Sequence, residues 1–210
     1  MRKNRPALFM KIPVAVLLFF GATLSPGQAP ADTDTRDLSR EQTPAGTTLI
    51  HFGQVDNGVY KGSKPRRDAD YRFLQSLHVK HVVDLQVIPL AYWLEKRKAK
   101  RYGIVLLPSR MNASPFSPSE KHIEAILAVL RDERYHPVYF HCALGRDRTS
   151  LIAALYKMYF LGMSPQNALR YLHESGYKDG WVRGGLKRYL ERHPTPPPAL
   201  LAPFVNRAEP

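Results

Sequence analysis

The feature that most constrains the fold is an alternation of short apolar segments with segments of helical periodicity. Apolar runs of strand length occur at 49–52, 58–60, 81–85, 104–107 and 137–141. Segments with helical spacing separate or follow them at 68–77, 92–102, 148–161, 164–175 and 181–192. Strands that alternate with helices in this order predict an α/β domain, in which helices flank a central, mostly parallel sheet.

Local signals mark the ends of some of these elements. Ser117 is predicted to cap a further helix, with Pro118 at the first helical position and Glu120 three residues after the cap. The stretch 61–65 combines glycine, serine and proline, and it therefore predicts a turn.

The two ends of the chain differ in composition from the region between them. Residues 2–11 include four basic side chains and no acid, 12–24 are apolar, and small residues follow up to Ala31. This order predicts a secretory signal peptide over 1–31 and export to the periplasm or out of the cell. The apolar run has 13 residues, fewer than the ~20 that span a bilayer, so we expect no stable membrane span after cleavage. The rest is predicted to comprise a flexible lead-in at 32–46, one domain at 47–193 and a Pro-rich disordered tail at 194–210.

The chain is strongly basic, with a formal net charge of +13 that falls to +9 without residues 1–31. A basic surface favours anionic partners such as phosphorylated substrates, acidic lipid head groups or nucleic acids. Nucleic-acid binding is not expected, because the basic residues lack interleaved aromatic side chains and any recognisable binding motif. No metal site and no cofactor is expected either, because eight histidines and one cysteine show no ligand spacing.

The single cysteine, Cys142, lies in the segment 141–149, between a predicted strand and a predicted helix. A tight loop at such a place turns its backbone N–H groups inward, and the following helix adds the partial positive charge of its N-terminus. Such a loop binds phosphate. Its substrate-binding residues are predicted to be Ala143, Leu144, Gly145 and Arg146, with the glycine where the chain must turn sharply.

The remaining residues of this segment predict a nucleophile and a phosphate clamp. The planar guanidinium of Arg148 can hold two phosphate oxygens at once. Positive surroundings lower the pKa of a cysteine from ~8.5 to ~3.5–7.5, so we expect Cys142 to be a thiolate that attacks phosphorus. Water would then hydrolyse the phosphocysteine, with Thr149 hydrogen-bonding the departing sulfur. His141 is predicted to orient the loop rather than to transfer protons.

The string HCALGRDRT resembles the HCX5R[ST] signature of the protein tyrosine and dual-specificity phosphatase superfamily. The residues in register with that signature are His141, Cys142, Gly145, Arg148 and Thr149. Two weaker likenesses lie upstream, where 59–65 is similar to a turn and 82–85 to a strand of small microbial members. The resemblance covers roughly 49–192 and implies the dual-specificity-like cysteine-phosphatase fold and the hydrolysis of phosphomonoesters.

The family's usual general acid has no counterpart in this sequence. Its members protonate the leaving oxygen with an aspartate on a mobile loop, and the matching stretch, 107–116, contains no acid. Asp147 is the predicted replacement, because a neighbouring phosphate raises the proton affinity of a carboxylate. Gly-Arg-Asp-Arg-Thr also resembles the Gly-Lys-Asp-Arg-Thr loop of bacterial phosphatases that act on phosphotyrosine and phosphoinositides. The alternative, that Asp147 only pairs with Arg146 or caps the helix, stays open, and Glu120 is assigned to helix capping.

Three functions remain open from the sequence. The first is a metal-independent phosphatase acting on phosphotyrosine and also on phosphoserine and phosphothreonine. The second has the same chemistry with phosphoinositides or inositol polyphosphates as substrates, which Arg146 and Asp147 favour. The third is a module that binds phosphate without turnover. A rhodanese-like sulfurtransferase is disfavoured, because the spacing between Cys142 and Arg148 fits phosphate.

Overall fold

The computed structural model describes residues 42–86, 88–109, 111, 118–180 and 184–201. The predicted signal peptide and most of the predicted lead-in lie outside these residues. Contacts divide the chain into two units, Met1–Ala31 and Asp32–Pro210. Every described helix, strand and core residue belongs to the second unit, which therefore holds a complete fold of its own.

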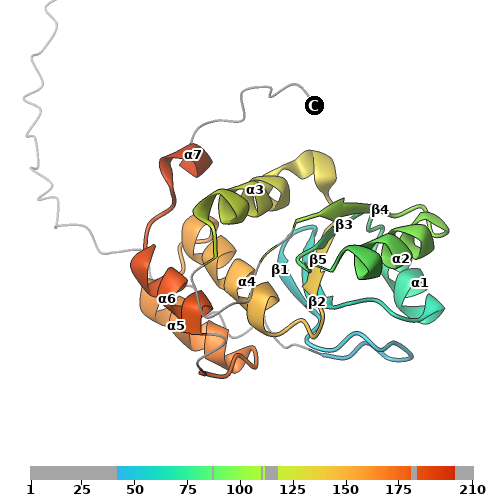
Figure 1. Ribbon diagram of the computed structural model, residues 1–210, viewed down its shortest axis with the longest axis horizontal. Coiled ribbons are helices and arrows are strands. Elements are labelled where there is room, and N and C mark those ends of the chain that lie inside the picture. Colours follow the sequence, from blue (N-terminus) through green and yellow to red (C-terminus); the bar gives the residue numbers. More distant parts are fainter. Residues whose placement is uncertain (1–41, 87, 110, 112–117, 181–183, 202–210) are drawn as a thin grey trace, which may run out of the picture. The chain divides into compact units, whose positions relative to one another are not determined.

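A five-stranded sheet forms the centre of this fold. Its strands are β1 Gly53–Asp56, β2 Val59–Ser63, β3 His81–Asp84, β4 Val105–Pro108 and β5 Val138–Cys142, in the spatial order β1-β2-β5-β3-β4 (Figure 1). β1 pairs antiparallel with β2, and the other neighbouring pairs are parallel. The middle strand, β5, is buried along its whole length, as expected inside a parallel sheet. The predicted mostly parallel sheet is confirmed.

Helices cover both faces of the sheet. They are α1 Asp68–Ser76, α2 Pro89–Lys100, α3 Glu120–Arg131, the short 3₁₀ helix η1 Glu133–Tyr135, α4 Asp147–Phe160, α5 Pro165–Glu174, α6 Gly184–Arg192 and α7 Pro198–Leu201. Figure 1 shows α1 and α2 on one side of the sheet and α3 to α6 on the other. None of the described helices is long and apolar enough to cross a membrane.

The two faces hold two separate hydrophobic clusters, because successive side chains of a strand point to opposite faces. On β5, Val138 and Phe140 belong to the larger cluster and Tyr139 to the smaller. The larger cluster is centred on α4, in which every residue from Thr149 to Met158 is buried. The N-terminus of this central helix follows the carboxyl end of β5 directly after the segment 143–146.

The N-terminal strands differ from the prediction. Residues 49–52 form no strand, apart from an isolated bridge between Phe52 and Gln42, and β1 begins at Gly53. The predicted turn at 61–65 is also wrong, because Lys61–Ser63 continues β2 and pairs with Phe140–Cys142 of β5. The parallel partner strand, which is distant in sequence, overrides the local turn signal.

Two predictions near helix ends are corrected as well. Ser119 is the N-cap of α3 and Glu120 its first residue, so Glu120 does not act as the predicted capping residue three positions on. Ser117 lies outside the described residues. In the predicted tail, α7 replaces extended chain, since Leu200 is buried in the larger cluster and its carbonyl accepts a hydrogen bond from Arg131.

Candidate active site

The segment between β5 and α4 forms a tight loop that packs against the end of β2. Gly145 has a φ of 71°, and a Cβ atom there would lie 2.5 Å from the carbonyl carbon of Gly62 and 2.6 Å from the nitrogen of Ser63. The backbone N–H of Lys64 donates to the carbonyl of Ala143 at 3.4 Å. Only glycine fits this close approach, so the loop conformation depends on Gly145.

Cys142 is the last residue of β5 and is 3% exposed. Burial by itself raises the pKa of its thiol. Hydrogen bonds from the side chain and backbone of Thr149 and from the backbone of Leu144, together with the charge of Arg148, outweigh burial and lower the pKa below the usual value. The site therefore favours the thiolate. Thr149 occupies the first turn of α4, where the helix N-terminus adds positive potential.

Arg148 is held in place by two backbone carbonyl groups. Its Nη1 atom donates to the carbonyl oxygen of Leu85 at 2.9 Å and to that of Met111 at 3.2 Å. These acceptors follow β3 and β4, so the carboxyl ends of three parallel strands meet around Arg148 and Cys142. This edge of the sheet is where open α/β folds bind ligands.

Behind the loop, His141 and Glu95 are fully buried and form a network with Lys64, whose side chain is 19% exposed. Its Nε2 lies 2.8 Å from Glu95 Oε1 and its Nδ1 lies 3.2 Å from the carbonyl oxygen of Cys142. Glu95 Oε2 lies 2.8 Å from Nζ of Lys64. Both ring nitrogens thus face acceptors. Burial lowers the pKa of His141, but the charge and hydrogen bond of Glu95 outweigh burial and raise it, which favours the imidazolium.

The same network reaches Asp84 at the end of β3. Asp84 Oδ1 lies 3.8 Å from Nδ1 of His141 and accepts hydrogen bonds from the backbone N–H and side-chain amide of Gln86. Asp84, Glu95 and His141 bring potential metal-ligand atoms within 4.8 Å of one another. Glu95, however, already binds the ammonium of Lys64 and the ring of His141. The cluster is therefore interpreted as a hydrogen-bonded support for the loop.

Replacing Glu95 by glutamine is expected to raise the pKa of Cys142. The glutamine can still accept a hydrogen bond from His141, but without the carboxylate the imidazolium loses its counter-charge and deprotonates. We expect alkylation of Cys142 by iodoacetamide to slow roughly tenfold at pH values well below the pKa of its thiol, which corresponds to a pKa shift of about one unit, and to stay unchanged at alkaline pH. The matched control is Glu174→Gln, whose side chain is 66% exposed on α5. An unchanged pH profile of alkylation would show that Glu95 has only a structural role.

Asp147 and Arg146 lie at the junction of the loop and α4. Asp147 is the first residue of α4, and its Oδ1 lies 3.4 Å from Nε of Arg146. The pairing that the sequence offered as an alternative is thus present. A position directly before Arg148 also suits a proton donor to a bound phosphate ester. The geometry is compatible with both roles.

Sequence reasoning missed Glu95 and Lys64. Lys64 lies in the stretch that predicts a turn at 61–65, and the helical spacing of 92–102 does not distinguish Glu95 from its neighbours. A signal existed, since Glu95 is the one acid between residues 85 and 119 and stands directly before a basic run. Its contact with His141 depends on the packing of α2 on the sheet, which no local pattern shows.

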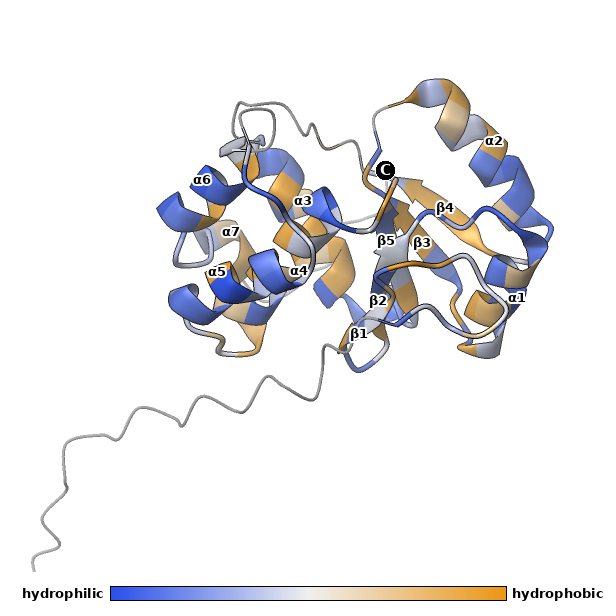
Figure 2. Cartoon of the chain, turned by 90° about the horizontal axis from the view of Figure 1, so that it is seen from below, coloured by the Kyte–Doolittle hydropathy of each residue, from blue (hydrophilic) through white to orange (hydrophobic). Residues whose placement is uncertain are grey.

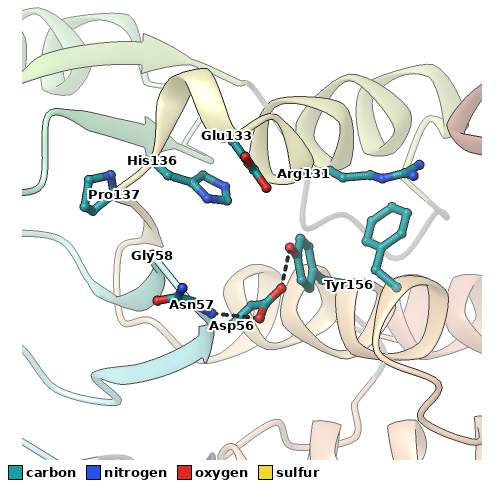
Figure 3. Close-up of a pocket in the computed structure, with 9 residues that line it drawn as sticks. Asp56, Asn57, Gly58, Arg131, Glu133, His136, Pro137 and Tyr156 are labelled. Carbon is teal, nitrogen blue, oxygen red and sulfur yellow. Dashed lines mark hydrogen bonds between the residues drawn. The ribbon is translucent and has the colours of Figure 1, made fainter. Parts of the chain in front are cut away.

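A pocket opens at the edge of the sheet opposite to the Cys142 loop, where β2 and β5 begin (Figure 3). Its lining residues are Asp56, Asn57, Gly58, Arg131, Glu133, His136, Pro137, Tyr156 and Phe160. Asp56 accepts hydrogen bonds from the Tyr156 hydroxyl at 2.9 Å and from the backbone N–H of Asn57 at 2.7 Å (Figure 3). Arg131 donates to the carbonyl of Leu200. Because these charged groups are engaged by the chain itself, this pocket is not the candidate active site.

A buried, low-pKa cysteine in a glycine-containing loop before a helix, with an arginine beside it, defines the class of cysteine-dependent phosphatases. Comparison with known families agrees: residues 47–159, more than half of the chain, match the tyrosine phosphatase family. The protein belongs to this family and is a phosphatase.

Similar proteins include a protein phosphatase and an inositol diphosphatase. The dual specificity protein phosphatase TpbA of Pseudomonas aeruginosa is 28% identical over 178 residues, which cover 83% of this chain and 76% of TpbA. The inositol diphosphatase DSP3 of Arabidopsis thaliana is 29% identical over 113 residues, which cover 51% of this chain and 54% of DSP3. This second match thus spans about half of each chain.

Solved structures confirm the fold. The crystal structure of P. aeruginosa TpbA matches with a TM-score of 0.60 at 22% identity, over 75% of this chain and 92% of that chain. The core catalytic domain of the PP-IP phosphatase SIW14 from S. cerevisiae, in complex with citrate, matches with a TM-score of 0.56 at 19% identity, over 67% of this chain and 83% of that chain. The predicted cysteine-phosphatase fold is therefore confirmed.

Proposed function

We propose that this protein hydrolyses phosphotyrosine in proteins, and also phosphoserine and phosphothreonine, through a phosphocysteine on Cys142 and without a metal ion. The observation that carries this proposal is the lowered pKa of a buried thiol beside the first turn of α4, which contributes Arg148 and Thr149. A buried cysteine that only packs in the core would be a neutral thiol, because burial raises its pKa. The groups that stabilise the Cys142 thiolate therefore point to a chemical role.

The reaction follows from this arrangement. The Cys142 thiolate attacks phosphorus in line with the ester oxygen, the P–O bond breaks, and the departing oxygen takes a proton from Asp147. Water then attacks the phosphocysteine, the P–S bond breaks, and Asp147 takes a proton from that water. Throughout, Arg148 and the loop N–H groups bind the equatorial oxygens, on which negative charge is spread in the transition state. The hydroxyl of Thr149 stabilises the departing thiolate.

A second candidate substrate class is phosphoinositides or inositol polyphosphates. Arg146 adds a positive charge at the last position of the loop, and a multiply phosphorylated ligand would use it. The relatives described as an inositol diphosphatase and a PP-IP phosphatase support this candidate, while TpbA supports the first.

The test compares turnover of a phosphotyrosine peptide and of inositol polyphosphates by Asp32–Pro210 in EDTA. Preferred hydrolysis of the peptide supports the first proposal, and preferred hydrolysis of the inositol phosphates replaces it with the second. If the protein binds phosphate but hydrolyses neither, the non-catalytic module is the correct function.

Replacing Asp147 by asparagine is expected to lower kcat/KM about 10²–10³-fold on phenyl phosphate, because kcat/KM reports the steps up to phosphocysteine formation and general acid catalysis contributes roughly that much when the leaving group is poor. On p-nitrophenyl phosphate, whose leaving group needs no proton, kcat/KM should change little. The control is Asp179→Asn, an exposed aspartate outside the loop. Equal losses on both substrates would assign Asp147 to holding Arg146 rather than to proton transfer.

We also propose that residues 1–31 direct export, with the domain acting in the periplasm or outside the cell. The order of basic, apolar and small residues supports this location. Cell fractionation with sequencing of the mature N-terminus tests it, and an intact leader on protein in the cytoplasmic fraction would refute it.

A further inference from the structure

Helix α2 buries a charged side chain and exposes large apolar ones, which is the reverse of an ordinary surface helix. Its fully buried positions are Glu95 and Ala99, whereas Leu90, Trp93 and Leu94 are 67%, 51% and 55% exposed. Ile88, the N-cap, is 58% exposed. Figure 2 shows apolar colouring on the first half of α2 and hydrophilic colouring on the second half. Large apolar side chains at positions i, i+3 and i+4 thus share one exposed face.

The active-site network fixes this orientation. Glu95 must face inward, because it binds both His141 and Lys64 at 2.8 Å. Rotating α2 to bury Leu90 and Trp93 would withdraw Glu95 from both partners and leave the charge of His141 buried without compensation. The apolar face is therefore a stable feature of the folded domain, and the domain itself offers nothing to cover it among the described residues.

The charges around this face select its partner. After Leu94, the exposed residues of α2 and its C-cap are all basic: Lys96, Arg97, Lys100 and Arg101. The guanidinium of Arg97 stacks on Trp93, with its carbon 4.7 Å from the ring centre. Two copies of this face would bring like charges together, which disfavours self-association. A surface that is anionic outside and apolar beneath meets both requirements, and lipid head groups over acyl chains have this character.

We propose that the exposed face of α2 docks on an anionic lipid surface. In the docked state, Leu90, Trp93 and Leu94 enter the boundary between head groups and acyl chains, while the four exposed basic residues contact lipid phosphates. Such docking would determine where the enzyme works, which is separate from its hydrolysis of phosphate esters.

Docking would place the phosphate-binding loop near the membrane. The Nζ of Lys64 donates to the carbonyl of Ala91 in the first turn of α2 at 3.2 Å. The backbone N–H of Lys64 donates to the carbonyl of Ala143 in the loop. The docking face and the loop are thus joined through one residue at the carboxyl edge of the sheet.

The experiment measures co-sedimentation of Asp32–Pro210 with vesicles of phosphatidylcholine alone or mixed with phosphatidylglycerol. We expect binding only to the mixed vesicles, weakening as salt is raised. The combined substitution Leu90→Ser, Trp93→Ser and Leu94→Ser should reduce binding at least tenfold and leave turnover of a soluble phosphate ester unchanged. Leu201→Ser, which changes a leucine that is 62% exposed on α7, is the matched control and should bind like the wild type.

Three results would overturn this inference. They are no binding to the mixed vesicles, equal binding by the triple variant, and equal binding to vesicles without phosphatidylglycerol. Sedimentation equilibrium gives a fourth, because a wild-type dimer that the triple variant converts to a monomer would assign the face to a second copy. The parallel assay on a soluble ester separates these outcomes from a failure of the proposed catalysis.

Discussion

Replacing Arg148 by lysine lowers kcat about 10³-fold on a phosphotyrosine peptide, because arginine contacts to a transferred phosphoryl group contribute on that order. Lysine keeps the charge but loses the planar fork that meets two oxygens. It also loses the bonds from Nη1 to the carbonyls of Leu85 and Met111, which aim the side chain. The measurement is steady-state kinetics with kcat and KM determined separately.

Arg170→Lys is the matched control for this substitution, because Arg170 is 62% exposed on α5 and bonds only a surface asparagine and glutamate among the described residues. It should leave kcat unchanged. If Arg148→Lys kept more than a tenth of wild-type kcat, the guanidinium would not be the clamp that the geometry indicates.

Replacing Gly145 by alanine destabilises the domain by about 2–4 kcal/mol and lowers kcat more than about 100-fold, since it combines left-handed backbone strain with overpacking. The added methyl group would stand 2.5 Å from a carbonyl carbon of β2, so the loop must move away from the strand. Moving the loop displaces the N–H groups that surround Cys142. Urea denaturation and kcat on the same preparation measure the two effects.

The control Gly103→Ala separates the effect of left-handed backbone strain from that of the steric clash with β2. Gly103 has a similar φ of 68°, but a Cβ there would meet nothing within 4 Å. This control should lose only about 1 kcal/mol and keep full activity. Equal losses of stability and activity for the two variants would mean that contact between the loop and β2 does not matter.

The parts of the fold that the sequence predicts correctly are those whose signals are local. The strand, loop and helix around Cys142 are contiguous, so the spacing of Gly145 and Arg148 was enough to place the loop between β5 and α4. The apolar runs that became β3, β4 and β5 were found for the same reason.

Features that depend on distant contacts were missed. Lys61–Ser63 reads locally as a turn but becomes strand because it pairs with β5. Glu95 lies in a predicted helix directly before a run of basic residues, yet it is buried against His141. α7 reads as tail, although Leu200 completes a core built on α3 and α4. In each case tertiary packing decided against the local pattern.

The most direct test of the central claim is whether phosphate becomes covalently bound to Cys142. Asp32–Pro210 would be mixed with a phosphotyrosine peptide in EDTA, denatured within the first turnover and digested for mass spectrometry. The account predicts one phosphoryl group on the peptide that contains Cys142, and neither this adduct nor turnover in Cys142→Ser. Phosphate on a different residue, or turnover that persists in Cys142→Ser, would contradict it.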